Sequence, residues 1–325
     1  MKRRIKKILL VLLPILLGVF LIWWSLSSLT DVDIKEIKNA FQNANYYWIF
    51  LSLLLGLLSH LSRAYRWKFF LEPLGYKPRF LNSVFAIFTA YLLNLFLPRA
   101  GEVARATGIS KYEAIPFEKA FGTIVAERII DVIMLLIIVA VAFFYQFDLL
   151  FDLVQKKIPD NPLFLILMSL LFVGLGVLLF YFIKKSTNSF FVRIRSFVIG
   201  LLEGIKSIVT MKKRGSFIAH TIFIWAMYLL MFYTVSFALP ETANLSLGAV
   251  VTGFVVGALS IATTNGGLGT YPLGVQQVLV LFGIASNPAL AFGWLMWTAQ
   301  TFMILVFGGI SLLVLPIYNR KFLKD

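Results

Sequence analysis

The composition of the chain excludes an ordinary soluble protein. Of its 325 residues, 60% are apolar and 14% are charged, whereas soluble domains are roughly half apolar and one quarter charged. There is no cysteine, which excludes disulfides and cysteine-bound metal or cluster sites, and two histidines are too few for a histidine-ligated metal cluster. We attribute the net charge of +15 to cytoplasmic loops of a membrane protein rather than to a nucleic-acid site.

The N-terminal region predicts a retained membrane span followed by a surface helix. Five of the first seven residues are basic, and the apolar run Ile8–Ser28 is too long for the core of a signal peptide. We therefore expect a first span with a cytoplasmic N-terminus. From Asp31 to Tyr47, apolar residues recur at helical spacing, which indicates a short amphipathic helix on the membrane surface.

Further apolar segments have the length of about 20 residues that a spanning helix needs. The second span begins at an aromatic group, residues 46–48, and is expected to end near Ser62. The other predicted full spans are Ala120–Tyr145, Pro162–Ile183, Ser216–Leu239 and Ala289–Ile317.

Two apolar stretches are interrupted. Leu81–Leu97 stops at a segment that contains Pro98 and Gly101, and Leu247–Gly283 is broken by a glycine-rich loop. Of the 30 lysines and arginines, 26 lie in residues 1–7, 63–80, 98–128, 184–214 and 318–325. If all five segments are cytoplasmic, as the positive-inside rule favours, each interrupted stretch must begin and end on the same side of the membrane.

The expected fold is therefore an all-α polytopic membrane protein, a single domain over residues 1–325. It has about six full transmembrane helices and two broken or re-entrant helical hairpins that enter from opposite faces, at about residues 81–119 and 247–284. Such interrupted segments point to a transport site at the membrane midplane. Their opposite polarity leaves an inverted repeat as one interpretation.

The first break carries the densest group of polar residues. Pro98 prevents the helix from continuing, and Gly101 permits a turn. Freed backbone N–H groups and two nearby arginines would suit an anionic phosphate, which arginine binds bidentately. The candidate substrate-binding residues here are Asn94, Arg99, Gly101, Glu102 and Arg105.

Three more ionisable residues, Glu127, Arg128 and Asp131, lie in the following apolar segment. Glu127 and Asp131 are four residues apart and share a helical face. Because charges inside a membrane segment are costly, a functional site is the first interpretation. The alternative is a salt-bridge network that pins the first hairpin to this span.

The second break offers uncharged groups, namely Asn265, Gly266, Gly267 and Gly269. Such a loop can bind a head group through backbone N–H donors, or it can let two helices pack closely. After the second span, Arg63 and Arg66 are expected among lipid phosphates as an interfacial anchor.

Three motifs together resemble those of the lysylphosphatidylglycerol synthase transmembrane family, also called the flippase-like domain family. They are Asn94-Leu-Phe-Leu-Pro98-Arg99-Ala-Gly101-Glu102-Val-Ala-Arg105, Ala126-Glu127-Arg128-Ile-Ile-Asp131 and Gly266-Gly267-Leu268-Gly269. They occur in the family's order through nearly the whole chain. At the last motif, Asn265 stands where relatives commonly have proline, and no acidic residue follows; Gln276 and Gln277 are the nearest polar side chains.

The resemblance implies a membrane module that moves a lipid between leaflets, while a separate soluble domain makes that lipid. Because the chain ends soon after its last predicted span, we expect a stand-alone membrane module without the synthase domain, and aminoacyl transfer is not expected. The expected function is translocation of an anionic or phosphate-linked lipid in the bacterial inner membrane, with both termini cytoplasmic. We expect no catalytic residues, cofactor, metal or nucleic-acid partner. The expected partners are membrane lipids and a separate lipid-modifying enzyme.

Two other functions stay open at this point. The first is an integral-membrane enzyme that modifies a lipid-linked substrate, with Glu102 as its general base. The second is a non-transporting membrane protein that stabilises another enzyme. The sequence has no Gly-x-x-x-x-Gly-Lys-Ser/Thr motif and therefore does not support ATP hydrolysis by this chain.

Overall fold

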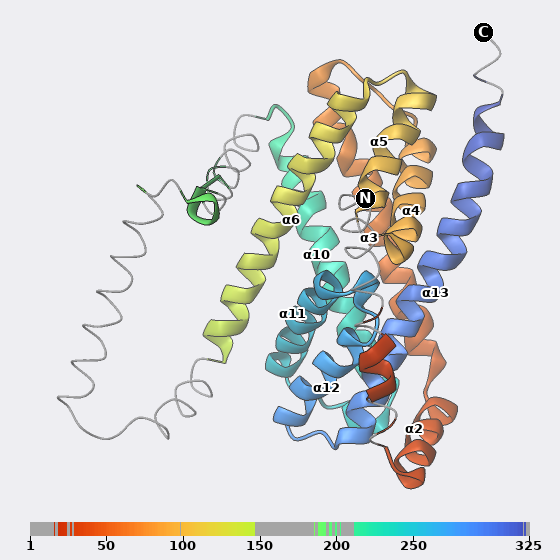
Figure 1. Ribbon diagram of the computed structural model, residues 1–325, viewed down its shortest axis with the longest axis vertical. Helices are drawn as coiled ribbons and strands as arrows, with labels where there is room; N and C mark the ends of the chain where they lie inside the picture. The colour runs from red at the N-terminus through yellow and green to blue at the C-terminus, as the bar shows by residue number, and fades with distance from the viewer. Residues whose placement is uncertain are drawn as a thin grey trace, which may run out of the picture. The chain divides into compact units, whose positions relative to one another are not determined.

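A computed structural model describes most of the chain (Figure 1). The described residues are 16, 19–24, 27, 29–97, 99–146, 185, 188–192, 195, 196, 199, 202, 211–320 and 322. The predicted span Pro162–Ile183 lies outside them, as does most of Ile8–Ser28. The chain divides into two compact units, residues 1–127 with 215–325 and residues 128–214, and each is considered by itself.

The described residues are helical, and no strand occurs among them. Three helices within this part of the chain are long and apolar enough to cross a membrane; they lie at Tyr46–Leu74, Arg214–Ser236 and Ser286–Asn319. Shorter apolar helices lie at Phe80–Phe96 and Leu247–Thr263. The chain is therefore a polytopic helical membrane protein, as its composition predicts.

Helices α2 (Asp31–Asn43) and α3 (Tyr46–Leu71) form the N-terminal part of the first unit. Helix α2 begins with a reciprocal capping box between Thr30 and Asp33. The prediction that the second span ends near Ser62 is wrong. Helix α3 continues to Leu71 and is followed by the 3₁₀ turn η1 (Glu72–Leu74). The apolar residues after Ser62 continue the buried face of the helix, and the basic residues among them find partners inside the protein instead of marking a loop.

Helices α4 (Phe80–Phe96) and α5 (Ala100–Glu113) form a helical hairpin, which we call the first hairpin. A Cβ added at Gly101 would overlap the carbonyl oxygen of Ala90, so only glycine lets the helices approach this closely. At the open end of the hairpin, Asn82 and Glu113 are hydrogen-bonded to each other, and Arg79 forms an ion pair of 2.8 Å with Glu113.

The second hairpin consists of α11 (Leu247–Thr263), the 3₁₀ turn η3 (Asn265–Gly267) and α12 (Thr270–Leu281). Two glycines let its helices pack closely. Gly257 faces the ring of Tyr271, and a Cβ at Gly274 would lie 2.7 Å from Oγ of Ser260. Both predicted interruptions are thus breaks between two helices.

The predicted spans at residues 120–145 and 216–239 correspond to α6 (Phe117–Tyr145) and α10 (Arg214–Ser236). A 3₁₀ turn, η2 (Pro240–Thr242), follows α10. An apolar core joins α10, α11, α12 and α13 in the first unit and includes Phe232, Val275, Leu279 and Phe292.

Helix α13 (Ser286–Asn319) runs along both hairpins (Figure 1). Its Gly293 lies against the backbone of Pro272 in α12, where an added Cβ would be 2.7 Å from the carbonyl oxygen. Its Gly308 lies against α4, where a Cβ would be 2.7 Å from Cβ of Leu92. These close approaches place one hairpin beside each half of α13.

Candidate functional site

A buried cluster of ionic side chains lies in the first unit, which we call the arginine cluster: Arg63, Arg66, Arg105 and Glu127. The carboxylate of Glu127 contacts Nη1 of Arg63 at 2.6 Å, Nη2 of Arg105 at 2.8 Å and Nη2 of Arg66 at 3.6 Å. All four side chains are at least 96% buried. Three guanidinium groups therefore converge on one carboxylate in the interior of the protein.

Four helices supply the cluster and its immediate partners. Arg63 and Arg66 are three residues apart on α3 and share a face, Arg105 comes from α5, and Glu127 comes from α6. Arg66 also donates a 3.0 Å hydrogen bond from Nη1 to Oγ1 of Thr221 on α10. The cluster thus fastens the first hairpin to α3 and α6, which is the arrangement that the structural alternative predicts.

Aromatic rings hold the three arginines. The guanidinium carbon of Arg105 lies 3.8 Å from the ring centroid of Trp67, and the indole Nε1 donates a 2.9 Å hydrogen bond to Oγ1 of Thr123. Thr123 is one helical turn before Glu127 on α6. Arg66 lies over Phe217 at 5.5 Å and Arg63 over Tyr228 at 5.9 Å. Stacking on a ring leaves the edge of each guanidinium group available for planar, bidentate contacts.

The chemistry of the cluster is that of an anion site. Arginine holds carboxylate and phosphate in the same forked geometry, so the position of the Glu127 carboxylate is one in which a phosphate would also be held. Buried charges are costly unless they are paired, and removing one partner of such a group strongly destabilises a protein. The cluster can therefore stabilise the fold, and the anion that its arginines hold in this structure is the carboxylate of Glu127.

The structure separates the two arginines of the first break. Arg105 is buried in the cluster, while Arg99 is exposed at the tip of the first hairpin with a left-handed backbone (φ 62°). Asn94 caps α5 from the end of α4, because its Oδ1 accepts a 2.8 Å hydrogen bond from the backbone N–H of Gly101. Its Nδ2 also lies 3.4 Å from Oε2 of Glu102. Asn94, Gly101 and Glu102 therefore lie together at the tip. Arg105, by contrast, belongs to the buried arginine cluster.

Arg63 and Arg66 differ most from their predicted placement. The sequence predicts an anchor among lipid phosphates after the end of a span. In the structure, both lie inside α3, with 3% and 0% of their surface exposed, and contact Glu127. The presence of two arginines in a segment that keeps its apolar helical pattern was the available signal for this placement.

Arg128 and Asp131 belong to the second unit. Nη1 of Arg128 lies 3.7 Å from Oδ2 of Asp131, one turn along α6. The side chain of Arg128 is 42% exposed and that of Asp131 is 13% exposed. The pair is a local contact along one helix.

The second break meets the first. Nδ2 of Asn265 donates a 3.3 Å hydrogen bond to the backbone oxygen of Phe96, at the end of α4. Gly266, Gly267 and Gly269 all have positive φ, of 62°, 78° and 73°. No local sequence pattern marks Trp297 of α13, whose Nε1 donates a 2.8 Å hydrogen bond to the backbone oxygen of Gly266.

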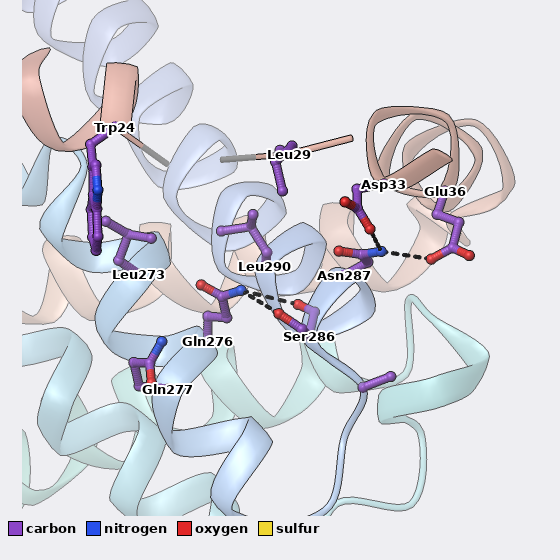
Figure 2. A pocket seen from close by; sticks show the side chains of 11 residues that line it. Trp24, Leu29, Asp33, Glu36, Leu273, Gln276, Gln277, Ser286, Asn287 and Leu290 are labelled. Atoms are coloured by element: carbon purple, nitrogen blue, oxygen red, sulfur yellow. Dashed lines mark hydrogen bonds between the residues drawn. The ribbon is translucent and has the colours of Figure 1, made fainter. Parts of the chain in front are cut away.

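A cavity of about 390 Å³ lies between α2 and the loop from α12 to α13 (Figure 2). Its two carboxylates, Asp33 and Glu36, both accept hydrogen bonds from Nδ2 of Asn287, at 2.8 and 2.7 Å. The bond from Asn287, then those from Thr30, lower the pKa of Asp33. Gln276 donates to Oγ of Ser286 at 2.9 Å, whereas Gln277 is exposed. The contacts of Asn287 fasten α2 to the start of α13, and Gln276 joins α12 to the same turn, so the carboxylates have a structural use.

Residues suited to a metal ion do not gather in the described part of the chain. No group of three or more histidine, aspartate or glutamate side chains there has a suitable arrangement. Trp67, Thr221 and Trp297 contact groups that are far away in the sequence, namely Arg105, Arg66 and the backbone of Gly266. No local sequence pattern marks these three residues.

Comparisons with known proteins identify the family. The sequence profile described as the lysylphosphatidylglycerol synthase TM region matches residues 11–309. The UPF0104 membrane protein PH1989 of Pyrococcus horikoshii is 29% identical over 144 residues, which cover 43% of this chain and 41% of that protein. The UPF0104 membrane protein MJ1595 of Methanocaldococcus jannaschii is 31% identical over 109 residues, which cover 33% of this chain and 32% of that protein.

The matched segments thus span less than half the length of either curated relative. Both relatives are archaeal, and the location in a bacterial inner membrane stays a prediction. No solved structure matches the chain significantly.

Proposed function

Because the chain belongs to the lysylphosphatidylglycerol synthase TM region family, we propose that it is a lipid translocase for a lipid with an anionic or phosphate-linked head group. The observation that carries the proposal is the arginine cluster. Ionisable groups inside a membrane protein are expensive and are characteristic of substrate pathways. Three guanidinium groups held by aromatic rings suit a phosphate, and their shared carboxylate keeps them together between transport events.

The hairpins support a route across the membrane. We propose that the two hairpins are re-entrant and enter from opposite faces, since they lie beside opposite halves of α13 and their tips are in contact. Broken helices at the membrane midplane are a common basis of transport sites. With basic segments inside, both termini are cytoplasmic.

We propose that the chain acts as a transporter and not as an enzyme. Glu127 is engaged by three arginines, and Glu102 lies against the helix-capping Asn94. Both carboxylates have contacts that position other groups. Movement of the lipid is then passive, ion-coupled or driven by a partner, and a separate enzyme supplies the lipid.

Reconstitution tests this function. The purified protein is placed in phosphatidylcholine vesicles with a trace of NBD-labelled phosphatidylglycerol, and dithionite reports how fast the probe leaves the inner leaflet. We expect faster exchange than in protein-free vesicles. Without acceleration for this probe or for labelled phosphatidic acid, the translocase proposal fails; a change in lipid mass after incubation would favour an enzyme.

Three variants test the site. Arg105→Gln removes one guanidinium group from the cluster and should slow exchange at least about tenfold, the factor that roughly 1.4 kcal/mol produces. Lys111→Gln removes an exposed charge from the same helix and should exchange at the wild-type rate. Arg105→Lys, which retains the charge, controls for folding together with size-exclusion chromatography. A folded Arg105→Gln protein with wild-type exchange would show that the cluster is not the phosphate site.

A further inference from the structure

The tips of the two hairpins meet beside the middle of α13. Trp297, which contacts the second tip, lies eleven residues after the start of α13, and Gly308, which contacts α4, lies eleven residues before its end. At 1.5 Å per residue, each is about 17 Å from the nearer end of the helix. Because a membrane core is about 30 Å thick, the junction lies near the midplane if α13 crosses the membrane.

Contacts from two sides hold the second tip at this junction. Asn265 donates to the backbone oxygen of Phe96, and a Cβ added at Gly266 would lie 2.6 Å from Cδ2 of Leu95. From the other side, the indole of Trp297 binds the backbone oxygen of Gly266. The second tip is therefore placed between the first hairpin and α13.

The second tip keeps its shape through hydrogen bonds of its own. The hydroxyl groups of Thr264 and Thr270 are 2.8 Å apart, Thr264 also donates to the oxygen of Leu268, and Thr270 donates to the oxygen of Ser260. These bonds do not depend on the first tip. Of the side-chain hydrogen bonds described at this tip, separation from its neighbours would break those of Asn265 and Trp297.

The backbone at the junction allows such a movement. Gly266, Gly267 and Gly269 have left-handed conformations that glycine adopts without strain. Domain and loop closures are commonly absorbed by a few residues of this kind at the ends of helices. The first tip differs, because the side chain of Asn94 caps α5 and links both arms of that hairpin.

We infer that the contact between the hairpin tips is a gate on the lipid path. Two hydrogen bonds keep it closed: Asn265 binds the first tip, and Trp297 binds the second tip to α13. This inference rests on the translocase function proposed above. In the closed state, Asn265 bridges the tips. When the second tip moves away from Phe96, a phosphate head group passes between the tips. There it contacts the guanidinium group of Arg99, which is exposed on the first tip.

A reversible cross-link tests the gate. The chain has no cysteine, so an engineered Leu95→Cys/Gly266→Cys pair supplies the protein's two thiols. The variant is oxidised and reconstituted with the NBD-phosphatidylglycerol probe. Exchange is measured before and after addition of a thiol reductant, with extraction of the outer-leaflet probe by albumin as the readout, because dithionite would itself reduce the disulfide. Because both measurements use the same protein, any effect of the substitutions themselves cancels. We expect at least tenfold slower exchange in the oxidised protein and recovery after reduction.

The outcomes separate the gate from the function. Exchange that is equally fast before and after reduction, in protein whose cross-link is verified by mass spectrometry, overturns the gate and leaves the translocase proposal standing. If neither the reduced variant nor the wild-type protein accelerates exchange, the translocase function itself is rejected, and the gate with it.

The role of Trp297 is tested by a substitution that removes its hydrogen bond to the second tip. Trp297→Phe keeps an aromatic ring and removes the N–H donor to Gly266, so the closed state loses one hydrogen bond. We expect exchange to be about fivefold faster, the factor expected for one neutral hydrogen bond. Trp294→Phe, one turn earlier on α13, is the matched control. It keeps an aromatic ring beside Trp297, whose ring centroid lies 5.6 Å away, and leaves the hydrogen bond to Gly266 in place, so it should exchange at the wild-type rate. Equal exchange rates for the two variants would show that the hydrogen bond of Trp297 does not keep the gate closed.

Discussion

The two hairpins are alike in backbone plan and differ in how they are held. In each, two short helices meet at a break, and a glycine allows the arms to approach closely. The first hairpin is fastened by ionic side chains, with Arg105 bound to Glu127 and Glu113 bound to Arg79. The second hairpin packs in the apolar core, and its polar contacts among the described residues are made by hydroxyl, amide and indole groups.

This difference indicates a division of roles. Buried ion pairs with several partners lose much free energy when one partner is displaced, so they suit a part that stays in place. Single hydrogen bonds between neutral groups are each worth about 1 kcal/mol, and they suit a part that opens and closes. We therefore expect the first hairpin to be more sensitive to substitution in stability, and the second to be more sensitive in transport rate.

The largest expected effect concerns the carboxylate of the arginine cluster. Glu127→Ala leaves three buried guanidinium groups without their shared partner and should lower the free energy of unfolding by about 3–5 kcal/mol. Glu118→Ala removes an exposed carboxylate from the same helix and should have little effect. The midpoint of thermal unfolding in detergent measures both. Equal midpoints would contradict the assignment of the cluster as the fastening of the first hairpin.

The second effect concerns the close approach of α4 and α5. Gly101→Ala places a methyl group against the carbonyl oxygen of Ala90 and should cost about 1–3 kcal/mol, as overpacking usually does. Gly108→Ala lies on the same helix, where the nearest atom, Cδ2 of Leu315, is at an ordinary distance of 3.8 Å. That variant should be neutral or slightly more stable. The same unfolding measurement distinguishes them, and a neutral Gly101→Ala would refute the described packing.

A smaller effect is expected at the tip of the first hairpin. Asn94→Ala removes the acceptor for the backbone N–H of Gly101, and loss of a helix cap costs about 1 kcal/mol. Hydrogen exchange at the amide of Gly101 should accelerate while exchange at α13 stays unchanged. Protection that is unaltered in the variant would show that Asn94 does not cap α5.

The smallest effect concerns the response to acid of the contact between α2 and the start of α13. The hydrogen bonds from Asn287 and Thr30 lower the pKa of Asp33. A carboxyl with a lowered pKa stabilises the folded state above its unfolded value of about 3.9 and loses that contribution as the pH falls through the folded value. Thermal unfolding between pH 6 and pH 3 should therefore show a slightly steeper acid loss in the wild-type protein than in Asp33→Asn. Parallel curves would contradict this.

Local patterns in the sequence predicted the type of structure and the positions of its breaks. Apolar runs predicted helices that match α6, α10 and α13 within a few residues, because a spanning helix needs a minimum apolar length wherever it lies. Pro98 and Gly101, and the glycine run after Asn265, marked both interruptions, because the constraints on φ belong to the residues themselves. The end of α3 was misplaced, since the basic residues after Ser62 resemble a loop until their partners are known.

The pairing of charged side chains depends on how the helices pack. Arg63 and Glu127 are 64 positions apart in the chain and lie 2.6 Å apart in space, and Trp297 reaches Gly266 across 31 positions. No periodicity of a single segment contains such a pairing, because it depends on how the helices pack against one another. The membrane helices, their breaks and the set of charged side chains can therefore be predicted from the local pattern of residues. Packing decided that three arginines share one glutamate and that the two tips are in contact.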